Sequence, residues 1–462
     1  MDLIKALYFF VATEIFIYGL KFIEPLFFKL AIKSTALLNV LIDKDLDEDE
    51  KQGQLLKNIG GVLSSTFIFL FAIIVLGLIS VLPVFAYKFI QGKLGNPIDF
   101  YSYEMLIAMA TSIGIHKGLQ TRKKKADYGN WSKLFHRIVL NNYNIGKFLF
   151  KAKTKKLNSD TKKRKVIVSG LARSGTSAFT QKLHEAGQFT SLTYASVPFL
   201  MYPQTGLKLS SKSDTKQKER AHGDKVLFGV NSIEALEEYF FKVMTKDCFI
   251  EENTLNVYEM TDELAIEYEN YIRLICKDPS TYLSKNNNFI LRAKSQLEKD
   301  NQLKLILMVR NPFQQAESLL NQHLRFTGLQ EDDSFTLEYM NWLAHHEFGN
   351  GHKPFKLNHT DQVLNYHSTD INHWLASWLN YYDYALQFVE KDNVEVVIYE
   401  DFVNQPADLF RHLSSKLDME LKLDFDSKFE SSSYPERTNL SNNLIKKCAD
   451  LYQKYVNLGV IK

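Results

Sequence analysis

Apolar residues are concentrated in two long runs near the N-terminus of this 462-residue chain. In the second run, no charged residue occurs between Lys57 and Lys88. A helix that crosses a bilayer needs about 20 apolar residues, and buried helices of soluble proteins rarely have so long an uninterrupted apolar stretch. The pattern therefore predicts a membrane helix at about residues 60–87.

The first apolar run, at about residues 6–31, is interrupted by Glu14, Lys21 and Glu24. At about 100° per residue, these three side chains fall on one side of a helix. We predict that this run also spans the membrane, with its polar stripe against the 60–87 helix; the alternative is a helix that lies in the interface. The run is too long for a cleavable signal peptide.

Charged residues on the two sides of the 60–87 run differ in sign. The segment 43–50 before it is acidic, whereas basic residues follow it, with a cluster at residues 122–125. Positive charge near a membrane helix favours the cytoplasmic side. We therefore expect an integral membrane protein whose long C-terminal part is cytoplasmic, with the lipid bilayer as a partner.

The chain divides by pattern into a membrane region (1–100), a basic connector (101–160) and a larger domain (161–462). The connector contains an apolar piece, 105–115, which is too short to span a bilayer. Its basic clusters suit an anionic leaflet, although a solvated linker explains them equally well.

The larger domain alternates between short strand-like runs, the first of them β-branched, and helical patterns. The runs are residues 165–169, 303–309 and 394–399, and helical patterns follow near Ser174, Asn311 and Pro406. Such alternation predicts an α/β fold with a parallel sheet flanked by helices. In these folds, ligands bind beyond the carboxyl ends of the strands.

Composition excludes several classes of function. The formal net charge of +3 gives no electrostatic case for nucleic-acid binding. The three scattered cysteines, Cys248, Cys276 and Cys448, have no paired spacing, so we predict reduced thiols and neither a disulfide framework nor a cysteine zinc site. No metal site is predicted.

The predicted strand at residues 165–169 is followed by a glycine-rich loop that is typical of phosphate binding. Its proposed anion-binding residues are Gly170, Ala172, Arg173, Ser174, Gly175, Thr176 and Ser177. The glycine spacing and final hydroxyl match the nucleotide P-loop, but Thr176 replaces the lysine and the loop cation is Arg173. Backbone N–H groups at the start of a helix and a planar guanidinium both bind phosphate or sulfate oxygens.

A second anion-binding element begins where the run at 303–309 ends. Arg310 lies at the carboxyl end of this predicted strand, and Ser318 lies about two turns into the next helix. An arginine and a hydroxyl that converge in this way can hold a second phosphate. The alternative is that Arg310 only caps a strand-to-helix turn and that Ser318 faces solvent.

Together the two elements resemble the P-loop-like sulfotransferase superfamily, in which R-S-G-T-[ST] and R-[DN]-P-x5-S elements recur. A block around Lys285 and the late Tyr399–Phe402 segment are similar to a bacterial family of these enzymes. The resemblance covers about residues 163–425. It implies the sulfotransferase fold and the donor 3′-phosphoadenosine 5′-phosphosulfate (PAPS), without a metal.

The resemblance also implies catalytic roles for Arg173, Lys285 and a general base. Relatives place a carboxylate about twenty residues after the loop arginine, and this chain has none there. His222 is our first candidate for the base, and the further candidates are Glu219, Asp224 and His346. The expected acceptor is a hydroxyl or amine of a lipid, glycolipid or glycan.

Two other readings remain open from the sequence. A P-loop kinase or NTPase at the membrane would need a loop lysine and a carboxylate for magnesium, where this chain has Thr176, Arg310 and Asn311. A non-catalytic membrane scaffold that kept the fold is the second alternative. The sequence predicts no oligomeric state.

Overall fold

The computed structural model describes residues 3–92, 103–120, 129–155, 162–210, 235–277, 279–423 and 440–461, with a few isolated positions between them. The chain forms two compact units, Met1–Ile145 and Gly146–Lys462. Their boundary falls within the predicted connector.

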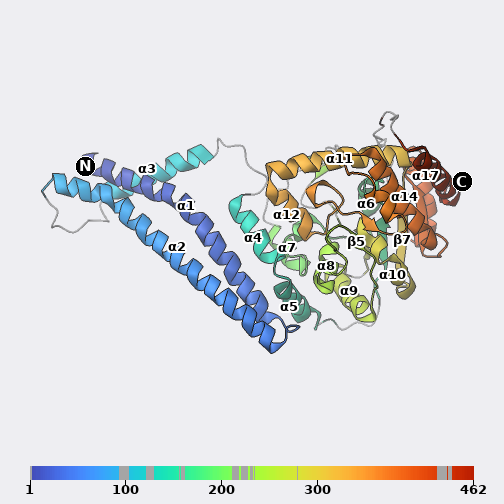
Figure 1. The fold of residues 1–462 in the computed structure, drawn as a ribbon, viewed down its shortest axis with the longest axis horizontal. Helices are drawn as coiled ribbons and strands as arrows, with labels where there is room; N and C mark the ends of the chain where they lie inside the picture. Colours follow the sequence, from blue (N-terminus) through green and yellow to red (C-terminus); the bar gives the residue numbers. More distant parts are fainter. Residues whose placement is uncertain are drawn as a thin grey trace. The chain divides into compact units, whose positions relative to one another are not determined.

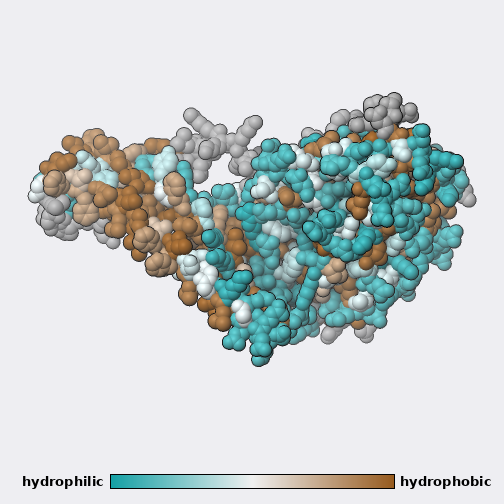
Figure 2. All heavy atoms as spheres, in the orientation of Figure 1, coloured by the Kyte–Doolittle hydropathy of each residue, from teal (hydrophilic) through white to brown (hydrophobic). Residues whose placement is uncertain are grey.

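The N-terminal unit is helical. Its helices are α1 (Leu3–Ile42), α2 (Glu48–Ile90), α3 (Tyr103–Gln120) and α4 (Asn130–Leu140). α1 packs along α2 and also contacts α3 and α4. By length and composition, α1 and α2 can each cross a membrane, and apolar residues cover much of their visible surface (Figure 2). At 1.5 Å per residue these helices are about 60 Å long, twice the hydrocarbon thickness of a bilayer, so the two predicted spans are parts of longer helices.

Polar residues of α1 have partners on two neighbouring helices. The Ser112 hydroxyl on α3 donates a hydrogen bond to the Glu14 carboxylate, and the Lys33 ammonium donates to the Gly61 carbonyl on α2 at 3.2 Å. We expected the stripe that contains Glu14 to lie against α2, whereas the partner of Glu14 is on α3.

The C-terminal unit is built on a five-stranded parallel sheet with the strand order β2-β6-β1-β7-β9. The strands are β1 (Lys165–Ser169), β2 (Phe189–Thr190), β6 (Thr281–Lys285), β7 (Leu303–Val309) and β9 (Val394–Ile398). Three of them confirm the predicted runs, except that Tyr399 begins a helix. β2 and β6 were not predicted as strands. Two small two-stranded sheets pair β3 (Lys218–Glu219) with β4 (Leu227–Phe228), and β5 (Leu255–Asn256) with β8 (Phe355–Lys356).

Helices follow most strands (Figure 1). α5 (Tyr143–Thr154) precedes β1, and the helices after β1 are α6 (Thr176–His184), α7 (Pro203–Ser210), α8 (Glu238–Thr245), α9 (Asp262–Ile275), α10 (Ala293–Lys299), α11 (Pro312–Asp332), α12 (Ser334–Trp342), α13 (Thr360–Leu364), α14 (Ile371–Ala385), α15 (Tyr399–Asn404), α16 (Pro406–Leu417) and α17 (Asn442–Leu458).

Side chains that alternate along β1 show that helices cover both faces of the sheet. Val166 and Val168 belong to an apolar cluster with residues of α6, α15 and α16. On the other face, the Lys165 ammonium pairs with Glu269 of α9 at 2.7 Å, and the Ser169 hydroxyl lies 3.1 Å from that of Tyr381 on α14. The expected α/β sheet flanked by helices is confirmed, and its carboxyl edge gathers the segments that follow β6, β1, β7 and β9.

Aromatic packing in the apolar cluster yields a stability prediction. The Phe179 ring is fully buried and stacks on Phe410 with a centroid distance of 5.2 Å. Phe179→Ala should lower the free energy of unfolding by about 3–5 kcal/mol, because it leaves a cavity in the core. The measurement is urea unfolding of the full chain in detergent, and Phe148→Ala on the exposed side of α5 is the matched control. Equal losses for the two variants would contradict this packing.

Candidate functional site

The loop after β1 has a backbone that requires glycine at two positions. Gly170 and Gly175 have φ angles of +152° and +91°, and Arg173 also has a positive φ, +69°. A Cβ atom on Gly175 would lie 2.3 Å from the Tyr399 ring, and one on Gly170 would lie 2.6 Å from the Met308 carbonyl oxygen. A left-handed non-glycine residue costs energy and is concentrated at functional sites, so Arg173 marks this loop as a candidate site.

The loop leads directly into the N-terminus of α6. Gly175 is the N-cap of α6 and has no side chain to cap the first turn, in which Thr176 and Ser177 are the first residues. Thr176 and Ser174 are buried, whereas Ser177 is partly exposed. The first N–H groups of a helix have no partner within the helix, and together with the helix dipole they attract an anion.

Gln315 of α11 holds the loop from the other side. Its Nε2 donates to the Leu171 carbonyl at 3.0 Å and to the Ala172 carbonyl at 2.9 Å. The sequence analysis missed Gln315, although it lies three residues before Ser318 and therefore on the same side of the helix. That spacing was the available signal.

The structure brings Arg173, Arg310 and Ser318 together. Arg173 Nε donates a hydrogen bond of 2.9 Å to the Ser318 hydroxyl, and Arg310 Nη1 donates to the Arg173 carbonyl at 3.2 Å. The two predicted anion-binding elements thus meet at one edge of the sheet. The Arg173 guanidinium is directed to α11, so this side chain joins the two elements instead of serving its own loop alone.

Arg310 has surroundings that suit an anion. It is 4% exposed, and its guanidinium carbon lies 4.6 Å from the centre of the Tyr399 ring. Burial lowers the pKa of Arg310, and the neighbouring Arg173 lowers it further, whereas Tyr399 and Glu400 raise it. A bound anion would offset the cost of placing two guanidinium groups side by side.

The segment after β6 lies beside the loop. Lys285, the last residue of β6, is the register partner of Val168, and it is partly buried. Asn287 lies two residues after Lys285. Its Oδ1 accepts a hydrogen bond from the Thr176 hydroxyl at 3.5 Å, and its Nδ2 donates to the Glu347 carboxylate at 3.5 Å. Asn287 and Glu347 were not among the predicted site residues.

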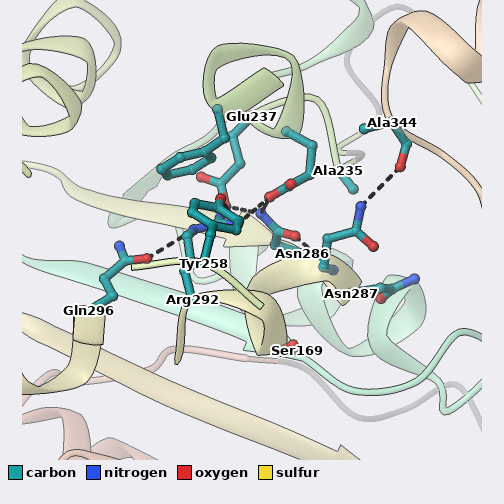
Figure 3. A network of polar contacts seen from close by, with 12 residues as sticks. Ser169, Ala235, Glu237, Tyr258, Asn286, Asn287, Arg292, Gln296 and Ala344 are labelled. Carbon is teal, nitrogen blue, oxygen red and sulfur yellow. Dashed lines mark hydrogen bonds and ion pairs between the residues drawn. The ribbon is translucent and has the colours of Figure 1, made fainter. Parts of the chain in front are cut away.

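A buried ionic network positions the end of β6 (Figure 3). Arg292 donates to Glu238 at 2.6 Å, and Asn286 donates to both Glu237 and Glu238. The Tyr282 hydroxyl donates to Glu237 at 2.9 Å. Burial raises the pKa of Glu237, which limits the net charge of two carboxylates beside one guanidinium.

Of the four candidates for the general base, only His346 has a side chain that the structure describes. His222 and Asp224 lie outside the described residues, and Glu219 is in β3 without a described side chain. His346 is 4% exposed, and its Nδ1 lies 2.9 Å from the Gly351 carbonyl. Among the described residues, no group of three or more His, Cys, Asp or Glu side chains forms a metal site.

No family model and no curated protein matches this chain. Solved structures that are similar include sulfotransferase STF9 from Mycobacterium avium, with 13% identity, a TM-score of 0.41, and coverage of 76% of this chain and 97% of that one. A sulfotransferase from Alicyclobacillus acidocaldarius has 14% identity, a TM-score of 0.32, and coverage of 64% and 94%. Sulfotransferase STF1 from Mycobacterium tuberculosis H37Rv has 8% identity, a TM-score of 0.34, and coverage of 75% and 80%. These similarities are too distant to decide function, which has to be inferred from the residues of the site.

Buried histidines near the site predict sensitivity to acid. Burial lowers the pKa of His323 and His346 to about 4 and that of His352 to about 3, from an ordinary value of 6.5. Below pH 6.5 the unfolded chain therefore binds protons that the folded chain does not, so stability falls as the pH decreases towards 4. Burial raises the pKa of Glu237 and Asp401, which acts in the opposite direction, but burial also lowers the pKa of His184 and His373.

Urea unfolding of the full chain should show a lower midpoint at pH 5 than at pH 7. His352→Gln should reduce this pH dependence by about one proton, because it removes one of the groups that titrate differently in the two states. The same substitution at exposed His367 is the control. A midpoint that does not change between pH 7 and pH 5 would show that these histidines are not buried as described.

Proposed function

We propose that the chain is a membrane-anchored sulfotransferase that transfers a sulfuryl group from PAPS to a hydroxyl or amine of an acceptor. The observation that carries this proposal is the hydrogen bond between Arg173 and Ser318, 2.9 Å long, which joins two anion-binding elements far apart in sequence. A nucleotide with phosphate groups on both its 5′ and 3′ sides needs two such elements within one adenosine's reach.

The residues present fit this donor. The N-terminus of α6, with Thr176 and Ser177, would hold the 5′-phosphosulfate end, since its N–H groups have no side-chain cap. Arg310 and Ser318 would hold the 3′-phosphate, and Arg173 lies between them. Two guanidinium groups and a hydroxyl form charge-assisted hydrogen bonds with phosphate oxygens.

PAPS supplies the sulfuryl group, and transfer consists mainly of positioning and charge stabilisation, as in phosphoryl transfer. Negative charge grows on the 5′-phosphate as the bond to sulfur breaks. The α6 amides, Arg173 and Lys285 would stabilise that charge. Thr176 replaces the lysine that an ATP-dependent P-loop enzyme would use, which disfavours the kinase alternative.

Membrane anchorage is the second part of the proposal. It is supported by α1 and α2, which are long and apolar enough to cross a bilayer. The basic residues after α2 favour a cytoplasmic position for the C-terminal unit. An enzyme held at a membrane meets lipids and lipid-linked glycans at high local concentration, so we propose a lipid, glycolipid or glycan acceptor.

Nucleotide binding provides a direct test. Ser318→Ala should weaken the binding of adenosine 3′,5′-bisphosphate about tenfold, because it removes one hydrogen bond to a charged group. Binding of adenosine 5′-phosphate, which has no 3′-phosphate, should weaken less, because Ser318 acts on that end only through its hydrogen bond with Arg173. Calorimetric titration of the full chain in detergent measures both, with the exposed Ser415→Ala as the control. A preference for ATP with magnesium would support the kinase alternative, and binding without PAPS turnover would support the scaffold.

Membrane insertion and orientation can be measured with a native thiol. Cys248 is exposed, whereas Cys276 and Cys448 are buried. In intact cells a membrane-impermeant maleimide should leave Cys248 unlabelled, and it should label this residue after lysis, because the C-terminal unit faces the cytoplasm. The protein should also resist extraction by alkaline carbonate, and Cys248→Ser should abolish the signal. Labelling of intact cells would reverse the orientation, and extraction by carbonate would exclude a spanning anchor.

A further inference from the structure

A carboxylate outside the predicted site residues lies beside the anion-binding loop. Glu347 belongs to the segment between α12 and β8, and its Oε1 accepts a hydrogen bond of 3.5 Å from Asn287 Nδ2. Asn287 Oδ1 in turn accepts from the Thr176 hydroxyl at 3.5 Å. One asparagine therefore separates this carboxylate from the first residue of α6, where the proposed donor site begins.

Asn287 is fixed by its own surroundings. It is 5% exposed, and the Tyr381 hydroxyl on α14 donates to its backbone carbonyl at 3.2 Å. The preceding residue, Asn286, is held by the buried ionic network around Arg292 (Figure 3). Asn287 also follows Lys285 by two residues, so one short segment carries both the proposed cation of the transfer site and the contact with the carboxylate.

The backbone on both sides of Glu347 is also fixed. His352 Nδ1 donates to the His346 carbonyl at 3.1 Å, and the Gly349 N–H donates to His323 Nδ1 at 3.1 Å. Gly349 has a φ angle of +73°, and a Cβ atom there would lie 2.3 Å from a side-chain oxygen of α11. A segment held in this way places its carboxylate before a substrate binds, which is what a positioned catalytic group requires.

Glu347 reaches the surface where its two neighbours do not. His346 and Phe348 are each 4% exposed, whereas Glu347 is partly exposed. A carboxylate that reaches the surface can meet an acceptor that arrives from outside. The ring of His346, the one described candidate for the base, is enclosed, so a bulky acceptor has no access to it.

Three other carboxylates near the carboxyl edge of the sheet already have close partners. Glu400 accepts from the Asn311 N–H at 3.1 Å and from the Tyr452 hydroxyl at 2.8 Å. Glu237 and Glu238 belong to the buried ionic network at the end of β6 and are each 1% exposed. These contacts hold the three carboxylates in structural roles and keep them from an incoming acceptor.

The Glu347 carboxylate keeps most of its capacity to accept hydrogen bonds. Within the described part of the chain, Asn287 is its one donor, and the distance of 3.5 Å is long for a hydrogen bond. An ionised carboxylate has about four acceptor positions and no donor. It can therefore accept a shorter hydrogen bond from a hydroxyl or amine and then take the proton.

We propose that Glu347 is the general base of the transfer reaction. The proposal rests on the function proposed above. The acceptor oxygen or nitrogen forms a bond to sulfur while the bond between sulfur and the 5′-phosphate oxygen breaks. The electron pair of the broken bond leaves with the phosphate, and the acceptor's proton goes to the Glu347 carboxylate. The segment after α12 thus supplies the carboxylate that the chain lacks about twenty residues after Arg173.

Membranes from the cells that naturally produce the chain supply the acceptor, whatever its class. The native gene is replaced by the wild type or a variant, and the transfer of ³⁵S from saturating labelled PAPS to membrane components is measured at equal protein level. Glu347→Gln should lower the rate at least about a hundredfold, because the amide can accept from Asn287 but cannot take a proton. Glu331→Gln at the exposed end of α11 is the charge-matched control and should keep the full rate.

Two further measurements separate a chemical role of Glu347 from a structural one. Adenosine 3′,5′-bisphosphate should bind purified Glu347→Gln as tightly as the wild type. The slow rate of Glu347→Ala should rise at least about tenfold with added sodium formate, because a small carboxylate can fill the space and accept the proton, whereas sodium chloride should have no effect.

Three results would overturn the role of Glu347: a Glu347→Gln variant with half of the wild-type rate, weaker nucleotide binding by that variant, or no rescue by formate. Loss of activity in His222→Gln together with an active Glu347→Gln would give the role to the first candidate from the sequence. A wild-type chain that labels no membrane component would instead refute the proposed function.

Discussion

The geometry of the candidate site depends on one contact, the hydrogen bond from Arg173 to the Ser318 hydroxyl. It ties the loop after β1 to α11, and Gln315 on the same helix holds the two loop carbonyls before Arg173. These side chains help to hold the loop in its positive-φ conformation, and the Tyr399 ring leaves no space for a side chain at Gly175. A guanidinium held in this way is placed before any anion arrives, which reduces the entropy that binding would cost.

A parallel sheet makes this contact possible. β1 lies between β6 and β7, so the carboxyl ends of the three strands present Lys285, the glycine-rich loop and Arg310 side by side. Two aromatic side chains of α14 donate hydrogen bonds to the backbone at the end of β7. The Tyr382 hydroxyl donates to the Met308 carbonyl at 2.8 Å, and Trp378 Nε1 donates to the Arg310 carbonyl at 3.1 Å. α14 thereby fixes the backbone at and just after the end of β7, from which Arg310 extends.

The segment after β6 connects the loop after β1 to a more distant part of the unit. Asn287 accepts from the Thr176 hydroxyl at 3.5 Å, and its Nδ2 donates to the Glu347 carboxylate at 3.5 Å. The side chain of the next residue, Asn288, donates to the Ala344 carbonyl at 2.9 Å. The start of α6 is therefore joined through two asparagines to the segment that follows α12.

The sequence by itself determined the elements whose signal is local. Long apolar runs marked parts of α1 and α2, short apolar runs marked β1, β7 and β9, and glycine spacing marked the loop, since each of these features is a pattern of neighbouring residues. Only the tertiary structure decided that β6 is a strand beside β1, because its burial comes from neighbours distant in sequence. The partner of Arg173 and the pairing of Arg292 with Glu238 are likewise contacts between segments far apart in the chain, and no local pattern encodes them.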